Sequence, residues 1–118
     1  MAKKILIVED SPFQAEDLSE ALAELDCEIS IAQLGKTALK NLSKDINIVI
    51  LDTVLPDIDG FELCRKIKAA RPDGLTMIMT TGKIDAVDAI KARESGADDY
   101  AVKTEGFRHL VDVVKKYL

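Results

Sequence analysis

The sequence contains little cysteine and no long hydrophobic run. Cys27 and Cys64 are the only two cysteines among 118 residues, and no secretory signal pattern precedes them. A disulfide framework is therefore not expected, and a reducing cytoplasm is the expected compartment. No stretch approaches the roughly 18 apolar residues that a membrane span needs, so a membrane protein is not expected either.

An excess of positive charge is also missing. The chain has 16 lysines and arginines against 21 acidic residues, which gives a formal net charge of -5. A surface that follows a nucleic-acid backbone needs clustered basic residues, so direct nucleic-acid binding is not expected. The length and the 47% hydrophobic content predict a single domain over residues 1–118, large enough to bury its own core.

Short apolar runs alternate with helical patterns along the whole chain. The runs predict strands at 5–8, 27–32, 46–51, 75–80 and 99–102. Five helical patterns alternate with these strands. The first begins at Ser11 and Pro12, the second covers 36–42, and the third ends near Arg71 and Pro72. The last two cover 85–94 and 107–118. In the first of these helices, Phe13, Leu18, Leu22 and Leu25 have helical spacing. This alternation predicts an α/β fold, a doubly wound (βα)5 three-layer sandwich around a parallel five-stranded sheet.

Chemically reactive side chains follow four of the predicted strands. Glu9 and Asp10 follow the first, Asp52 the third, Thr81 the fourth and Lys103 the fifth. Open α/β sheets bind ligands at the carboxyl ends of their strands, so these side chains are expected at one site. Three neighbouring carboxylates repel one another unless a cation neutralises them, and hard oxygen ligands favour Mg²⁺.

A Mg²⁺ ion at such a site suits the chemistry of phosphoryl transfer. The metal orients an incoming phosphoryl group and offsets its charge, and a carboxylate can then act as the nucleophile. Asp52 is the expected nucleophile because it ends the most central strand. The Lys103 ammonium and the Thr81 hydroxyl are expected to contact phosphoryl oxygens.

Four segments resemble motifs of the receiver domain of two-component response regulators. They are VEDS at 8–11, DTVLPDIDG at 52–60, MTTG at 79–82 and GADDYAVK at 96–103. The resemblance covers essentially the whole chain, and it implies the flavodoxin-like strand order 2-1-3-4-5. It also implies a phosphorylated switch that receives its phosphoryl group from a sensor histidine kinase or a histidine phosphotransfer protein. A downstream target or output domain, and a homodimer formed on phosphorylation, are further partners in keeping with this resemblance.

The resemblance assigns a role to each residue of the expected site. Asp52 is implied to be the phosphoacceptor, and Asp10 a direct Mg²⁺ ligand. Glu9 is implied to hold the metal through water, and Val54 to contribute its backbone carbonyl. Thr81 matches the hydroxyl residue of the family's switch, and Tyr100 matches its aromatic switch residue. Lys103 matches the lysine that binds the phosphoryl group.

Two positions leave other functions to be weighed. Thr104 follows Lys103 where the family usually has proline after a cis peptide, so a trans Lys103–Thr104 peptide is predicted. This departure is the one argument for a degenerate receiver that binds partners without phosphorylation. Haloacid-dehalogenase-like phosphatases also have a nucleophilic aspartate after a strand, but with a second aspartate two residues later. Val54 occupies that position here, so the chain is expected to modify itself and not to be a turnover enzyme.

Overall fold

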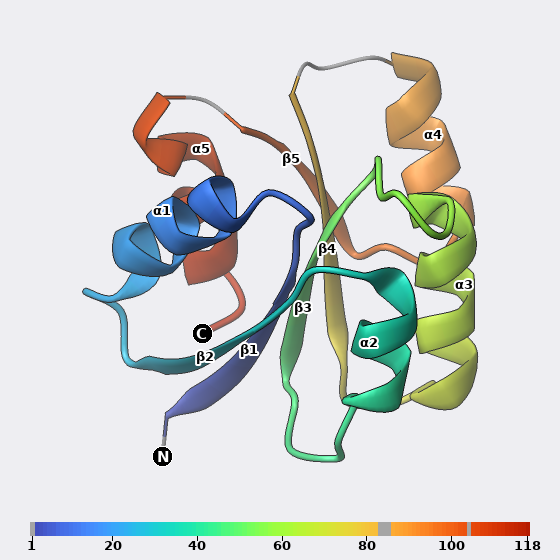
Figure 1. Ribbon diagram of the computed structural model, residues 1–118, viewed down its shortest axis with the longest axis horizontal. Coiled ribbons are helices and arrows are strands. Elements are labelled where there is room, and N and C mark those ends of the chain that lie inside the picture. Colours follow the sequence, from blue (N-terminus) through green and yellow to red (C-terminus); the bar gives the residue numbers. More distant parts are fainter. Residues whose placement is uncertain (1, 83–85, 104) are drawn as a thin grey trace.

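Five parallel strands form one sheet in the computed structural model, which describes residues 2–82, 86–103 and 105–118. The strands are β1 (Lys3–Val8), β2 (Cys27–Ala32), β3 (Ile48–Asp52), β4 (Thr76–Thr81) and β5 (Asp99–Val102). Their spatial order is β2-β1-β3-β4-β5, with every neighbouring pair parallel (Figure 1). The doubly wound α/β fold and the strand order expected from the sequence are thus confirmed. Within the described residues, no helix has both the length and the hydropathy to cross a membrane.

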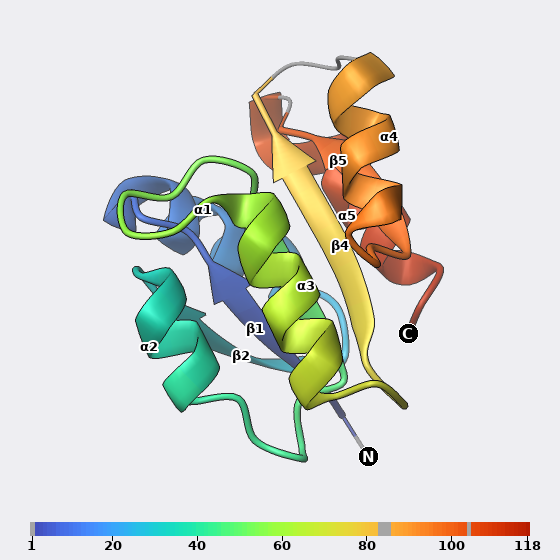
Figure 2. The same cartoon turned by 90° about the vertical axis from the view of Figure 1, so that its right-hand side faces the viewer.

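Helices cover both faces of the sheet and make the three layers. They are α1 (Pro12–Leu22), α2 (Gly35–Lys40), α3 (Gly60–Ala70), α4 (Ala86–Glu94) and α5 (Arg108–Lys115), with a 3₁₀ turn at Glu105–Phe107 before the last. Helices α1 and α5 lie on one face, and α2, α3 and α4 lie on the other (Figures 1 and 2). Parallel strands need crossover connections, and right-handed crossovers distribute the helices in this way.

The core is divided by the sheet into two apolar clusters. Along β1, Ile5 and Ile7 face the cluster that α1 and α5 cover, while Leu6 and Val8 face the cluster on the other side. This alternation follows from the two-residue period of a strand. All five residues of β3 are buried, as expected for the central strand of a sheet covered on both faces.

The boundaries of β2 and β5 match the predicted ones, while those of β1, β3 and β4 differ by one or two residues. Strand β1 begins at Lys3 because Lys3 and Lys4 pair with β2 while their side chains lie toward solvent. Strand β3 begins at Ile48 and not at Ile46, whose backbone N–H donates to Ser43 in the preceding turn. Hydropathy alone cannot locate such ends, because pairing continues into polar residues and stops at turns.

The first helix places one apolar residue outside the core. Leu18 and Leu22 are buried, as their spacing predicts, but Phe13 is 79% exposed. Phe13 precedes Leu18 by five residues, so it lies about 140° around the helix axis from that leucine, away from the face that packs on the sheet. Phe13 therefore does not share the buried face of the two leucines.

The connection from β3 to α3 is held close to the sheet by polar contacts. Asp59 caps α3 by accepting a hydrogen bond from the Glu62 N–H at 3.1 Å. The Asp57 carboxylate accepts bonds from the N–H groups of Gly35 and Lys36, at 2.9 and 3.0 Å, at the start of α2. These N–H groups lower the pKa of Asp57. Gly60 passes directly over the end of β3, where a β-carbon would have no room.

Gly60→Ala is expected to lower the free energy of unfolding by roughly 1–3 kcal/mol. A β-carbon at this position would meet the carbonyl oxygens of Asp52 and Thr53 at 2.6 Å, and these are backbone atoms that cannot rotate away. Urea unfolding followed by circular dichroism measures the loss. Gly82→Ala is the matched control, since among the described residues no atom lies within 4 Å of its β-carbon position. Equal losses in the two variants would contradict the close approach as the cause.

Candidate functional site

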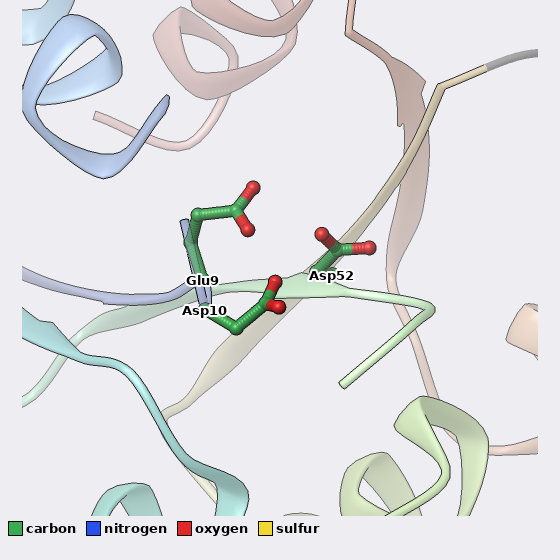
Figure 3. Close-up of side chains that lie close together, drawn as sticks. All are labelled: Glu9, Asp10 and Asp52. Atoms are coloured by element: carbon green, nitrogen blue, oxygen red, sulfur yellow. The ribbon is translucent and has the colours of Figure 1, made fainter. Parts of the chain in front are cut away.

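Three carboxylates meet at the carboxyl ends of β1 and β3. Ligand oxygens of Glu9, Asp10 and Asp52 all lie within 4.8 Å of one another. Figure 3 shows that Glu9 and Asp10 come from the segment after β1, whereas Asp52 comes from the end of β3. Glu9 and Asp52 are buried, while Asp10 is exposed. The structure thus brings together the acidic residues that the sequence placed at one site.

Strand register explains why these residues meet. Val8 of β1 pairs with Leu51 of β3, so Glu9 and Asp52 follow paired residues on adjacent strands. The Glu9 N–H donates to the Ala32 carbonyl at 3.0 Å, which continues the β1–β2 ladder by one residue. On the other side, the Thr53 N–H donates to the Thr80 carbonyl at 3.0 Å. Backbone pairing on both sides therefore fixes the positions of the two buried carboxylates.

Lys103 lies among the carboxylates. Its Nζ donates a hydrogen bond to Asp52 Oδ2 at 2.6 Å and a second one to Glu9 Oε1. The three side chains are 14%, 11% and 6% exposed for Lys103, Asp52 and Glu9, so solvent screens these ion pairs weakly. A third bond runs from Nζ to Gln14 Oε1 at 3.0 Å. Gln14 was missed in the sequence, where nothing links the first turn of α1 to a residue 89 positions later.

Burial and hydrogen bonding shift the pKa values of this cluster. Burial lowers the pKa of Lys103, but its bonds to Asp52 and Glu9 raise it, and the pKa lies above its ordinary value. Burial raises the pKa of Glu9, while the hydrogen bonds from Lys103 and the Ser11 N–H lower it. The effect of burial is the larger, so this pKa lies above its ordinary value. Lys103 therefore remains a cation at neutral pH and offsets part of the charge of the acids.

The segment after β3 arranges the backbone around Asp52. The Val54 N–H donates to Asp52 Oδ1 at 2.9 Å, so the two oxygens of Asp52 have different partners. The Val54 side chain is 74% exposed at the rim of a cleft of about 790 Å³ that the acidic cluster lines. An aspartate at this position would face solvent beside Asp52, and the chain has an aliphatic residue instead.

Thr81 lies at the cleft, whereas Tyr100 lies two strand pairs further from it along β4 and β5. Thr81 is buried at the end of β4 and lines the cleft, and its carbonyl accepts the Lys103 N–H at 2.7 Å. Tyr100 pairs with Met79 and packs, half-buried, against the cluster on the α4 side of the sheet. Thr104 lies outside the described residues, so the trans Lys103–Thr104 peptide stays a prediction.

The sequence matches the family model of the response regulator receiver domain over residues 5–115. The chain belongs to this family. Receiver domains are signalling domains of two-component systems, where they work with histidine kinases and output domains, and they use Mg²⁺ at an acidic pocket. The resemblance found in the sequence motifs is therefore confirmed.

Several curated relatives are similar along this receiver domain. The transcriptional regulatory protein AfsQ1 of Streptomyces coelicolor is 38% identical over 100 residues, which cover 84% of this chain and 44% of AfsQ1. The DNA-binding response regulator MtrA of Mycolicibacterium smegmatis is 36% identical over 121 residues, which cover 100% of this chain and 51% of MtrA. The chain thus spans about half the length of the curated relatives it matches.

Solved receiver structures share the fold over almost the whole chain. The BeF3-activated receiver domain of DrrB, a Thermotoga maritima protein, has a TM-score of 0.88 at 33% identity, covering 99% of this chain and 97% of that one. The response regulator TrrA of the same organism, solved in complex with Mg²⁺ and beryllium fluoride, has a TM-score of 0.87 at 36% identity, covering 98% and 99%.

Magnesium affinity is expected to rise when the positive charge of Lys103 is removed and to fall when the negative charge of Asp10 is removed. Lys103→Met should tighten Mg²⁺ binding by roughly tenfold, because the ammonium repels the metal and bonds to the oxygens of Asp52 and Glu9 that would hold it. Asp10→Asn should weaken it by roughly tenfold or more. Isothermal titration calorimetry measures both dissociation constants.

Lys40→Met is the matched control for this titration, since it removes the same charge from an exposed position on α2. Its dissociation constant should equal that of the unmodified protein. A Lys103→Met variant with unchanged or weaker Mg²⁺ binding would contradict the electrostatic account.

Proposed function

We propose that this receiver domain is a phosphoacceptor switch in which Asp52 is phosphorylated by a histidine kinase or a histidine phosphotransfer protein. The observation that carries the proposal is the position of Asp52. It is buried at the end of the central strand, beside two further acids and in contact with Lys103. A solvated acid at a strand end would have neither a buried lysine nor a metal-binding set beside it.

The acidic residues divide into metal ligands and a nucleophile. Asp10, Asp52 and the Val54 carbonyl would hold Mg²⁺ directly, and Glu9 would hold it through water. Glu9 already shares its oxygens between Lys103 and the Ser11 N–H, which suits an indirect role. When bound, Mg²⁺ supplies positive charge that orients the phosphoryl group and offsets the charge of its oxygens.

Phosphoryl transfer forms one bond at Asp52 and breaks one in the donor. A carboxylate oxygen of Asp52 attacks phosphorus in line, and the phosphorus–nitrogen bond of the donor phosphohistidine breaks. The released imidazole keeps the electron pair of that bond and takes up a proton. Lys103 and the Thr81 hydroxyl donate hydrogen bonds to the phosphoryl oxygens. Attack of water on phosphorus later breaks the bond between phosphorus and the Asp52 oxygen and releases inorganic phosphate, so the Asp52 carboxylate is restored.

The switch connects this chemistry to the surface formed by α4, β5 and α5. A phosphoryl group on Asp52 would draw the Thr81 hydroxyl toward it and empty space that the Tyr100 ring can enter. The change would alter the face that a downstream partner binds, and a homodimer on this face is one such partner. Thr81 and Tyr100 lie on paired strands, which is consistent with this coupling.

The domain boundaries and partners follow from the same proposal. Residues 1–118 form a single receiver domain that acts in the cytoplasm, where its kinase would deliver the phosphoryl group. The MtrA relative is described as DNA-binding, and this chain covers half of its length. With a net charge of -5, this receiver domain does not itself bind nucleic acid, so DNA contacts would belong to an output domain.

Two alternative functions fit the site less well. A degenerate receiver that acts without phosphorylation has no need for Asp52, Lys103 and two further acids in contact. A haloacid-dehalogenase-like phosphatase requires a general acid at the position of Val54. The completeness of the acidic and basic set therefore favours the phosphorylated switch.

Incubation with Mg²⁺ and acetyl phosphate is expected to add one phosphoryl group to the protein, and Asp52→Asn is expected to abolish the addition. The amide oxygen of asparagine is too weak a nucleophile to attack phosphorus. Intact-protein mass spectrometry measures the adduct. Asp73→Asn, an identical change in an exposed turn, is the control and should be labelled like the unmodified protein. Labelling of Asp52→Asn would overturn the assignment of the acceptor.

Thr81→Ala is expected to leave Asp52 phosphorylated but to reduce the response of the α4–β5–α5 surface. The hydroxyl that would move toward the phosphoryl group is absent from this variant. Nuclear magnetic resonance measures the response as chemical-shift changes at Tyr100 on adding beryllium fluoride and Mg²⁺. Thr76→Ala, at the opposite end of β4, is the control and should respond fully. A full response of Thr81→Ala would contradict the proposed coupling.

A further inference from the structure

Gln14 contacts the site from the first turn of α1. Its side chain is exposed at the rim of the cleft, and its Oε1 accepts a hydrogen bond from Lys103 Nζ at 3.0 Å. The residue follows the N-cap Ser11 by three positions, and its own backbone N–H donates to Ser11 Oγ at 3.3 Å. The cap that starts the helix therefore also places the Gln14 side chain.

Four residues form a closed ring of hydrogen bonds at this point. The Ser11 N–H donates to Glu9 Oε2 at 3.2 Å, and Ser11 Oγ accepts from the Gln14 N–H. Gln14 Oε1 accepts from Lys103, and Lys103 closes the ring by donating to Glu9 Oε1. Each member restrains the next, so the position of the ammonium depends on the start of α1 as well as on the acids.

Of the three hydrogen bonds that the Lys103 ammonium donates, two have acceptors that a metal or a phosphoryl group would also engage. A lysine ammonium has three N–H donors, and here they go to Asp52, Glu9 and Gln14. A metal and a phosphoryl group would draw on the oxygens of Asp52 and Glu9. The Gln14 amide is neutral, so a hard cation prefers the neighbouring carboxylates to it. The bond to Gln14 is thus the one that the lysine keeps when the site is loaded.

We propose that Gln14 is a positioning residue for phosphoryl transfer, which holds the Lys103 ammonium beside Asp52 while the other two acceptors are engaged by metal and phosphoryl group. This inference rests on the proposed function of Asp52. A neutral acceptor suits the role, because a glutamate at this position would add a fourth negative charge to the site and repel the incoming phosphoryl group. An apolar side chain would leave the third N–H donor to water, and the ammonium would be held less firmly.

Gln14→Met tests the inference because it keeps the length of the side chain and removes the acceptor. The initial rate of Asp52 labelling by acetyl phosphate and Mg²⁺ is expected to fall about threefold to tenfold, as for loss of one typical hydrogen bond at an exposed side chain. Intact-protein mass spectrometry over time measures this rate. Gln33→Met, the same substitution at an exposed residue that is not among the described residues lining the cleft, should label at the unmodified rate.

A second background separates positioning from a structural effect on α1. In Lys103→Ala protein, Gln14→Met should cause no further loss of rate, because Gln14 acts through the ammonium that this background lacks. The same fold-loss in both backgrounds would overturn the inference, as would equal rates for Gln14→Met and the unmodified protein. If the unmodified protein itself took up no phosphoryl group, the proposed function would fail, and this inference with it.

Discussion

The ion pairs of one lysine allow three acidic side chains to share the end of two adjacent strands. Carboxylates that approach within a few ångströms in a partly buried site repel one another strongly. Lys103 lies between Glu9 and Asp52, and it comes from the far edge of the sheet, 94 positions after Glu9 in the chain. Its long side chain extends past the end of β4 to reach β3 and β1. The site therefore exists only when β1, β3, β4 and β5 are assembled in this order.

The rest of the fold holds the acids at a fixed distance from that lysine. Strand β3 is buried on both faces, so Asp52 is presented from the most constrained part of the backbone. Gly60 lets α3 begin directly against the end of this strand, and Asp57 ties the intervening loop to α2. A rigid frame of this kind suits the proposed role of Asp52 as a nucleophile, because small displacements of a nucleophile slow transfer greatly.

Helix α1 contributes to the site through its first turn more than through its apolar face. Its buried leucines hold it on the sheet, while Ser11 and Gln14 connect its start to Glu9 and Lys103. Phe13 lies between these two residues in sequence and is exposed to solvent. The same turn thus joins the polar contacts of the cleft to an exposed aromatic side chain.

The sequence by itself determined the strands, their parallel direction and the acids at their ends, because apolar periodicity and short motifs are local features. The spatial order of the strands was implied by the resemblance to receiver domains. Asp52 and Lys103 were recognised in this way. The tertiary structure decided what touches the lysine: Gln14 joins it through a helix start that only the folded sheet brings near β5. It also shows Phe13 outside the core, on another face of α1 than the buried Leu18 and Leu22. Such contacts depend on register, helix position and side-chain direction together, and no local pattern encodes their combination.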